Sequence, residues 1–122
     1  MIIKFAVSKK LIVIADEVYR ENVYNGTEFQ SFRKILGKMG GGYERICELA
    51  SLHSVSKGLL GEGGLRGGYM YIHNFKSEIR EQLATMKIHH PGPNTIGQVM
   101  VELMVNPPLD GVTKQTKDKY LA

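Results

Sequence analysis

The chain has 122 residues, of which 16 are Lys or Arg and 12 are Asp or Glu, so its net charge is +4. Hydrophobic residues make up 43% of the chain, which is enough for the core of one small domain. A disulfide scaffold is excluded because Cys47 is the single cysteine. No apolar run reaches the roughly 20 residues of a membrane helix. We therefore expect no membrane partner and a reducing, cytoplasmic compartment, with the mitochondrion as the alternative.

The positive charges are dispersed among acidic residues. The nearest approach to a basic cluster is the group Lys114, Lys117 and Lys119 close to the C-terminus. Nucleic-acid binders concentrate their charge on a stripe or a tail, whereas isolated lysines in a polar segment are usually solvated. We predict no nucleic-acid partner and interpret residues 111–122 as a polar, weakly structured tail.

The apolar spacing divides the chain into strands that alternate with helices. Strands are predicted over residues 11–15, 46–53 and 68–72. Helices are predicted over residues 2–8, 29–39, 76–88 and 96–104, the last with Asn94 as its N-cap. The continuous apolar run at 11–15 is typical of a strand buried on both faces of a parallel sheet. This alternation indicates an α/β fold.

Two kinds of residue could suggest metal or redox chemistry, and neither has the pattern that such chemistry needs. Cys47 falls in the second predicted strand and is interpreted as a small buried residue. His89 and His90 are adjacent and have no cysteine or acid at ligand spacing. We predict no metal site.

Three short motifs carry polar side chains that are suited to chemistry. They are Asp16-Glu-Val-Tyr19, Ser54-Val-Ser-Lys-Gly58 and Arg66-Gly-Gly68. The first directly follows a predicted strand, where ligands bind in open α/β sheets. Taken alone, the first two motifs are more simply interpreted as a turn and a surface loop, and the third is compatible with a tight turn that carries a solvated arginine. A nucleotide P-loop is excluded because the lysine precedes the glycines instead of following them.

Taken together, in this order and spacing, the motifs strongly resemble the fold-type I pyridoxal-phosphate aminotransferases. Within that family the resemblance is strongest to the alanine aminotransferases. Residues 12–24 and 54–69 are similar nearly residue for residue, as are Gly97-Gln98 and Asn106-Pro-Pro108. The resemblance covers about residues 2–110. It implies that these residues are part of the α/β large domain of such an enzyme, with a mostly parallel sheet.

The resemblance also implies a cofactor, pyridoxal 5′-phosphate, and a role for three residues in its chemistry. The lysine matching Lys57 joins the cofactor aldehyde covalently and then moves a proton at the substrate Cα. The aspartate matching Asp16 contacts the pyridine nitrogen and keeps it protonated. The tyrosine matching Tyr19 donates a hydrogen bond to the phenolic oxygen of the cofactor.

The cofactor phosphate is expected to contact the remaining polar residues of the motifs. Ser54 and Arg66 match the phosphate-binding serine and arginine of the family, and Ser56 is expected nearby. The implied reaction transfers an amino group between L-alanine and 2-oxoglutarate, giving pyruvate and L-glutamate. Glutamate–glyoxylate aminotransferases are a close alternative, because the motifs bind the cofactor and do not select the substrate.

Some of the family's segments have no counterpart in these residues. The Asn-Pro-Gly-Asn-Pro-Thr-Gly stretch and the arginine that binds the substrate carboxylate are not found. We therefore expect residues 1–110 to be the second half of a cofactor domain, inactive or weakly active in isolation. A non-catalytic truncated product is the alternative from another class. The family resemblance further implies a homodimer.

Overall fold

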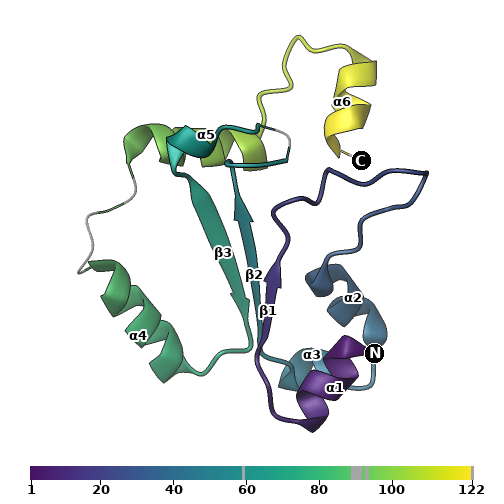
Figure 1. Ribbon diagram of the computed structural model, residues 1–122, viewed down its shortest axis with the longest axis vertical. Helices are drawn as coiled ribbons and strands as arrows, with labels where there is room; N and C mark the ends of the chain where they lie inside the picture. Colours follow the sequence, from purple (N-terminus) through teal and green to yellow (C-terminus); the bar gives the residue numbers. More distant parts are fainter. Residues whose placement is uncertain (59, 89–91, 93, 122) are drawn as a thin grey trace.

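The computed structural model describes the chain except residues 59, 89–91, 93 and 122. It has the α/β architecture expected from the sequence, with one small sheet and several helices (Figure 1). In chain order the elements are α1 (Ile2–Ser8), β1 (Val13–Asp16), α2 (Phe32–Met39), α3 (Tyr43–Ile46), β2 (Leu49–Ser54), the 3₁₀ helix η1 (Gly63–Leu65), β3 (Gly68–His73), α4 (Ser77–Ile88), α5 (Thr95–Val105) and α6 (Lys114–Leu121).

The sheet is mixed and has the strand order β1-β2-β3. β1 and β2 are parallel, with Asp16 in register with Leu52. β2 and β3 are antiparallel, with Ser54 opposite Gly68. The sheet that was expected to be mostly parallel is thus parallel at one of its two pairings. A parallel pairing needs a crossover, which α2 and α3 supply, whereas β3 follows β2 in the chain and runs antiparallel to it.

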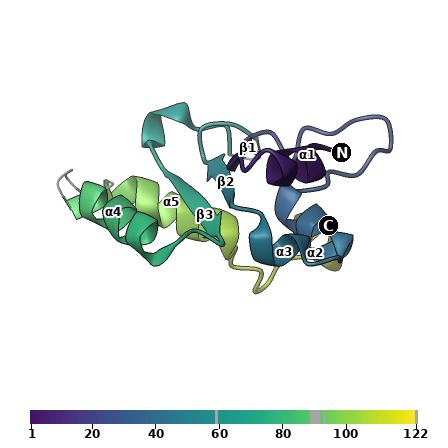
Figure 2. The ribbon, with the colours of Figure 1, turned by 90° about the horizontal axis from the view of Figure 1, so that it is seen from below.

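Helices α1, α2 and α3 gather beside β1, while α4 and α5 lie on the β3 side (Figures 1 and 2). The first group buries its apolar side chains against one face of β1 and β2. The members of this core are Ile3, Ala6, Val13, Ala15, Leu36, Cys47 and Leu49. Burial of apolar surface here anchors the two parallel strands to the crossover helices.

The prediction that the first strand is buried on both faces is wrong. Val13 and Ala15 point into the core, but Ile14 between them is 70% exposed. Successive side chains of a strand project to opposite faces. The described helices cover only one of these faces at β1, so the apolar run is half solvated.

The second strand begins at Leu49 and not at residue 46, because Tyr43–Ile46 form the short helix α3. Cys47 therefore lies at the C-cap of a helix and not in a strand. It is nevertheless 1% exposed. Burial raises the pKa of its thiol, and the charge of Glu48 adds to the effect. The interpretation of Cys47 as a small buried residue is therefore confirmed, although the element that carries it is not a strand.

Two other boundaries differ from those predicted. α2 begins at Phe32 and not at residue 29, because Ser31 caps it: the Ser31 Oγ accepts a hydrogen bond from the Lys34 N–H at 3.1 Å. The polar segment expected to be weakly structured contains the helix α6.

His89 and His90 lie outside the described residues. Elsewhere in the described chain, no group of three or more metal-ligating side chains forms.

The start of α5 is docked on the segment that precedes β3. Asn94 caps the helix as predicted, since its Oδ1 accepts from the Gly97 N–H at 2.7 Å. Its Nδ2 also donates to the Leu65 carbonyl at 3.0 Å. A Cβ on Gly67 would lie 2.5 Å from the Gly97 carbonyl oxygen, and a Cβ on Gly97 would lie 2.6 Å from the Leu65 carbonyl oxygen. The two backbones therefore touch only because both residues lack side chains.

None of the described helices is long and apolar enough to cross a membrane.

Replacing Gly97 by alanine is expected to destabilise the chain by about 1–3 kcal/mol, because the new methyl group meets fixed backbone and must force α5 away. Gly37 is the matched control, since it lies within α2 and a Cβ added to it would have no atom within 4 Å. Gly37→Ala should stabilise by about 0.5–1 kcal/mol through helix propensity. Urea unfolding of both variants gives the comparison. Equal stabilisation by both would show that the backbones are not in contact.

Candidate functional site

The three motifs meet at one edge of the sheet. Asp16 ends β1, Ser54 ends β2, and Gly68, the last residue of the third motif, begins β3. Since β1 and β2 are parallel, their carboxyl ends lie side by side. An open hollow of about 300 Å³ forms there, and its lining includes the polar motif residues Asp16, Tyr19, Ser54, Ser56 and Lys57. Two distant segments of the chain thus contribute to a single surface.

The adjacent acids of the first motif have different roles. Asp16 is exposed, and its Oδ1 accepts a hydrogen bond from the Val18 N–H at 3.3 Å, which turns the chain after the strand. Glu17 is directed elsewhere: its Oε1 accepts from the Phe32 N–H at 2.8 Å, at the start of α2. Of these two acids, only Asp16 lines the hollow.

Burial and backbone hydrogen bonds of Val55 hold the second motif in place, while the side chain of Lys57 is exposed. Val55 is fully buried, its N–H donates to the Gly67 carbonyl at 3.1 Å, and its carbonyl accepts from the Glu62 N–H. The Ser54 Oγ accepts from the Ser56 N–H at 3.3 Å. The Lys57 amine has no hydrogen bond or ion pair with the residues that the structure describes. It is therefore available to a ligand.

A close contact joins the second motif to the first. Gly58 has a φ of +59°, and a Cβ there would collide with Glu21 Oε2 and lie 3.2 Å from the Val18 carbonyl oxygen. The Glu21 Oε1 also lies 3.5 Å from the Nε2 of His53, which is 8% exposed. Glu21 thus packs between the loop after Tyr19 and the loop that carries Lys57. Sequence patterns did not identify Glu21 or His53, and the only signal for the contact was the glycine that follows the lysine.

Arg66 is the one predicted site residue that does not line the hollow. It has a φ of +53°, and its Nη1 donates to the Gly63 carbonyl at 2.9 Å within its own loop. This hydrogen bond is exposed, so releasing the side chain would cost only about 0.5–1.5 kcal/mol. The structure therefore brings together the other predicted residues and leaves Arg66 turned away from them.

These side chains define the class of the site. An available amine, a carboxylate, a phenol and two hydroxyls at the carboxyl edge of an α/β sheet are suited to a carbonyl compound that also carries an anionic group. The family model for aminotransferase class I and II matches residues 1–121, and the chain belongs to that family. Membership implies pyridoxal 5′-phosphate as the cofactor.

The chain is similar to several curated proteins that are named as alanine aminotransferases. It is 43% identical to "Probable alanine aminotransferase, mitochondrial" of Dictyostelium discoideum, over 98% of this chain and 22% of that protein. It is 45% identical to alanine aminotransferase 2 of Xenopus laevis, over 90% of this chain and 21% of that protein. With alanine aminotransferase 1 of Bos taurus the identity is 44%, over 88% and 22% respectively. The chain spans about a fifth of the length of these relatives.

The contact between the two motifs can be measured with a pair of glycine substitutions. Gly61 has a φ of +64° and no atom within 4 Å of a Cβ position, so Gly61→Ala should cost about 1–2 kcal/mol from backbone strain alone. Gly58→Ala carries similar strain and also displaces Glu21, so its loss should be greater by about 1–3 kcal/mol. Urea unfolding measures both losses. Equal losses would contradict a packed contact between the loops.

Proposed function

We propose that the chain is a segment of a pyridoxal-phosphate-dependent aminotransferase and forms part of its cofactor site. The proposal rests on one observation: Asp16, Tyr19, Ser54, Ser56 and Lys57 line the same hollow although a two-helix crossover separates them in the chain. The types of side chain fit the cofactor. An amine suits its aldehyde, a carboxylate suits its ring nitrogen, and hydroxyls suit its phosphate.

Lys57 and Asp16 are assigned the central roles in this proposal. The Lys57 amine would hold the cofactor through its aldehyde carbon. Once released, the amine would take a proton from the substrate Cα and deliver it to that cofactor carbon. The Asp16 carboxylate accepts a hydrogen bond from the ring nitrogen and keeps that nitrogen protonated. When bound, the cofactor supplies an electron-withdrawing ring that stabilises negative charge developing at the substrate Cα.

The remaining residues orient the cofactor. The Tyr19 hydroxyl is assigned to the phenolic oxygen of the cofactor, as a hydrogen-bond donor. The hydroxyls of Ser54 and Ser56 are assigned to the phosphate. Arg66 joins them as a charged donor once its hydrogen bond to Gly63 is released. The Ser56 N–H donates to the Ser54 Oγ, so both serines would present their hydroxyls to the phosphate from one short turn.

The proposed reaction moves an amino group between L-alanine and 2-oxoglutarate. It is supported by the names of the relatives, which are those of alanine aminotransferases. A glutamate–glyoxylate reaction is the alternative, since none of the residues described above contacts the substrate side chain. We further propose a homodimer and a cytoplasmic location. The mitochondrion is the alternative location, in line with the name of the Dictyostelium protein.

The covalent role of Lys57 is tested by trapping. The purified chain is incubated with pyridoxal phosphate, reduced with borohydride and digested for mass analysis. We expect a phosphopyridoxyl adduct on Lys57 in preference to other lysines, because its amine lies in the hollow that Asp16, Tyr19 and the two serines also line. Lys57→Ala should remove this adduct, while the control Lys76→Ala, at another exposed lysine, should keep it. An even distribution of adducts over the lysines would overturn the assignment.

Transamination by the 122-residue chain alone is expected to be absent or very slow. Lys57 is exposed, Tyr19 is 56% exposed, and the hollow is open, so water is not excluded from the reacting groups. The measurement follows pyruvate release from L-alanine and 2-oxoglutarate with added cofactor. Steady turnover that Lys57→Ala abolishes would contradict this expectation. A Lys57 adduct without turnover would agree with a cofactor site that needs further residues.

A further inference from the structure

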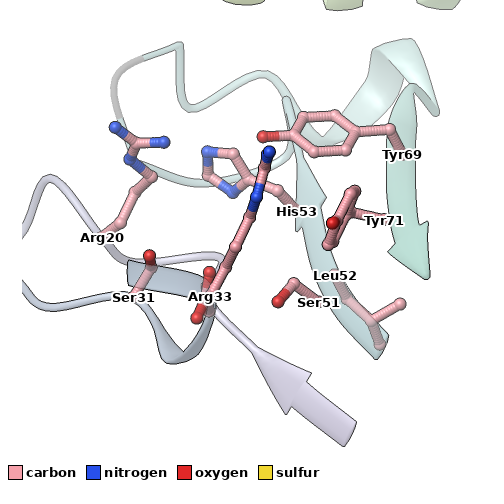
Figure 3. Close-up of a pocket in the computed structure, with 9 residues that line it drawn as sticks. Arg20, Ser31, Arg33, Ser51, Leu52, His53, Tyr69 and Tyr71 are labelled. Atoms are coloured by element: carbon pink, nitrogen blue, oxygen red, sulfur yellow. The ribbon is translucent and has the colours of Figure 1, made fainter. Parts of the chain in front are cut away.

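A second pocket lies on the other face of β2 from the hollow that Lys57 lines. Its volume is about 160 Å³, and its polar lining includes Arg20, Arg33, Ser51, His53, Tyr69 and Tyr71 (Figure 3). Ser51 and His53 alternate along the strand with Leu52 and Ser54, so they project from the opposite face. The register places Asp16 beside Leu52, on the face of the proposed cofactor site. The two cavities therefore open on opposite faces of the sheet, and Leu52 and His53 near the end of β2 border both.

The pocket contains buried polar atoms without partners. Ser51 and His53 are each 8% exposed. The Ser51 Oγ and the His53 Nδ1 are buried and make no hydrogen bond within the described chain. Each such group costs about 1–3 kcal/mol unless a water or a ligand pairs with it. The pocket is larger than one water, whose share of liquid volume is about 30 Å³.

Arg20, Arg33 and the carboxylate Glu17 line the pocket, and of the two arginines only Arg33 has no ion-pair partner among the described residues. Arg20 pairs with Glu21 at 3.2 Å, and the same carboxylate lies 3.5 Å from His53 Nε2. Glu17 accepts the Phe32 N–H at the start of α2, where the helix dipole favours a negative charge. The Arg33 guanidinium lies 4.3 Å from the centre of the Tyr71 ring and has no carboxylate partner among the described residues. Its charge is thus uncompensated by any ion pair within that part of the chain.

We propose that this pocket binds a small oxyanion, a carboxylate or a phosphate. Figure 3 shows Arg33 reaching from α2 toward the β2 and β3 side chains, with the Ser51 and His53 side chains projecting from β2 on the same side. The donors for the anion are the Arg33 guanidinium and the hydroxyls of Ser51 and Tyr69. The His53 Nε2 lies 3.5 Å from the Glu21 Oε1. In the neutral ring that carries its hydrogen on Nε2, Nδ1 is an acceptor, and a protonated phosphate or an ordered water supplies its donor. The site is independent of the proposed transamination.

The proposal is tested by titrating the ¹⁵N-labelled chain and following its histidine and arginine side-chain resonances. Three ligands are compared at constant ionic strength: acetate, phosphate and acetamide, which is the neutral analogue of acetate. We expect saturable shifts at His53 and Arg33 with either or both anions and none with acetamide. Phosphate binding without acetate binding would identify a phosphate site, and the reverse a carboxylate site. Equal shifts with acetamide, or shifts that do not saturate, would overturn the proposal.

Two variants distinguish a specific site from general attraction. Arg33→Gln should weaken binding about ten-fold or more, because it removes a charge-assisted hydrogen bond. Arg80→Gln removes the same charge from the exposed surface of α4 and should leave binding unchanged. Ser51→Ala should weaken binding without lowering thermal stability, since it removes a buried hydroxyl that lacks a partner within the described chain. If Arg33→Gln fails to fold, unchanged binding in Ser51→Ala overturns the proposal, and so does equal weakening by both arginine variants.

Discussion

The parallel pairing of β1 with β2 is the constraint on which the rest of the structure depends. It requires that the chain leave one end of β1 and return to the opposite end of β2, and α2 and α3 make this return. The apolar contacts of those helices with Val13, Ala15 and Leu49 hold the crossover in place. As a result, two motifs that are distant in sequence end at the same sheet edge. The geometry of the candidate cofactor site is thus a consequence of how the core is built.

The same strands serve two purposes because their side chains alternate. One face of β2 contributes Leu49 to the core and presents Ser51 and His53 to the second pocket. The other face, together with Asp16 of β1, leads to the hollow near Lys57. His53 connects the two sides, since its ring approaches Glu21 and Glu21 packs against Gly58, the neighbour of Lys57. His53, Glu21 and Gly58 thus form a short series of contacts between the second pocket and the residue next to Lys57.

Much of this organisation could be predicted from local sequence, and the parts that could not depend on tertiary contacts. The N-cap at Asn94 is confirmed because capping is a local property of a few residues. The burial of Ile14 was predicted wrongly because an apolar run does not reveal which of its faces a neighbouring helix covers. The strand assigned to Cys47 was wrong because a short helix and a buried strand share the same apolar pattern. Neither the Gly67–Gly97 contact nor the hydrogen bond of Arg66 to Gly63 leaves a periodic signal in the sequence.

The contact between Gly67 and Gly97 links the third motif to a helix without any intervening side chain. Flexible side chains usually absorb small displacements between elements, but two touching backbones transmit them directly. Gly67 in turn accepts the Val55 N–H, next to Ser54 and Ser56. A shift of α5 would therefore displace the segment that carries Arg66 and, through Val55, the segment that carries Ser54 and Ser56. The placement of α5 is therefore tied to the backbone of both segments that carry the proposed phosphate-binding residues.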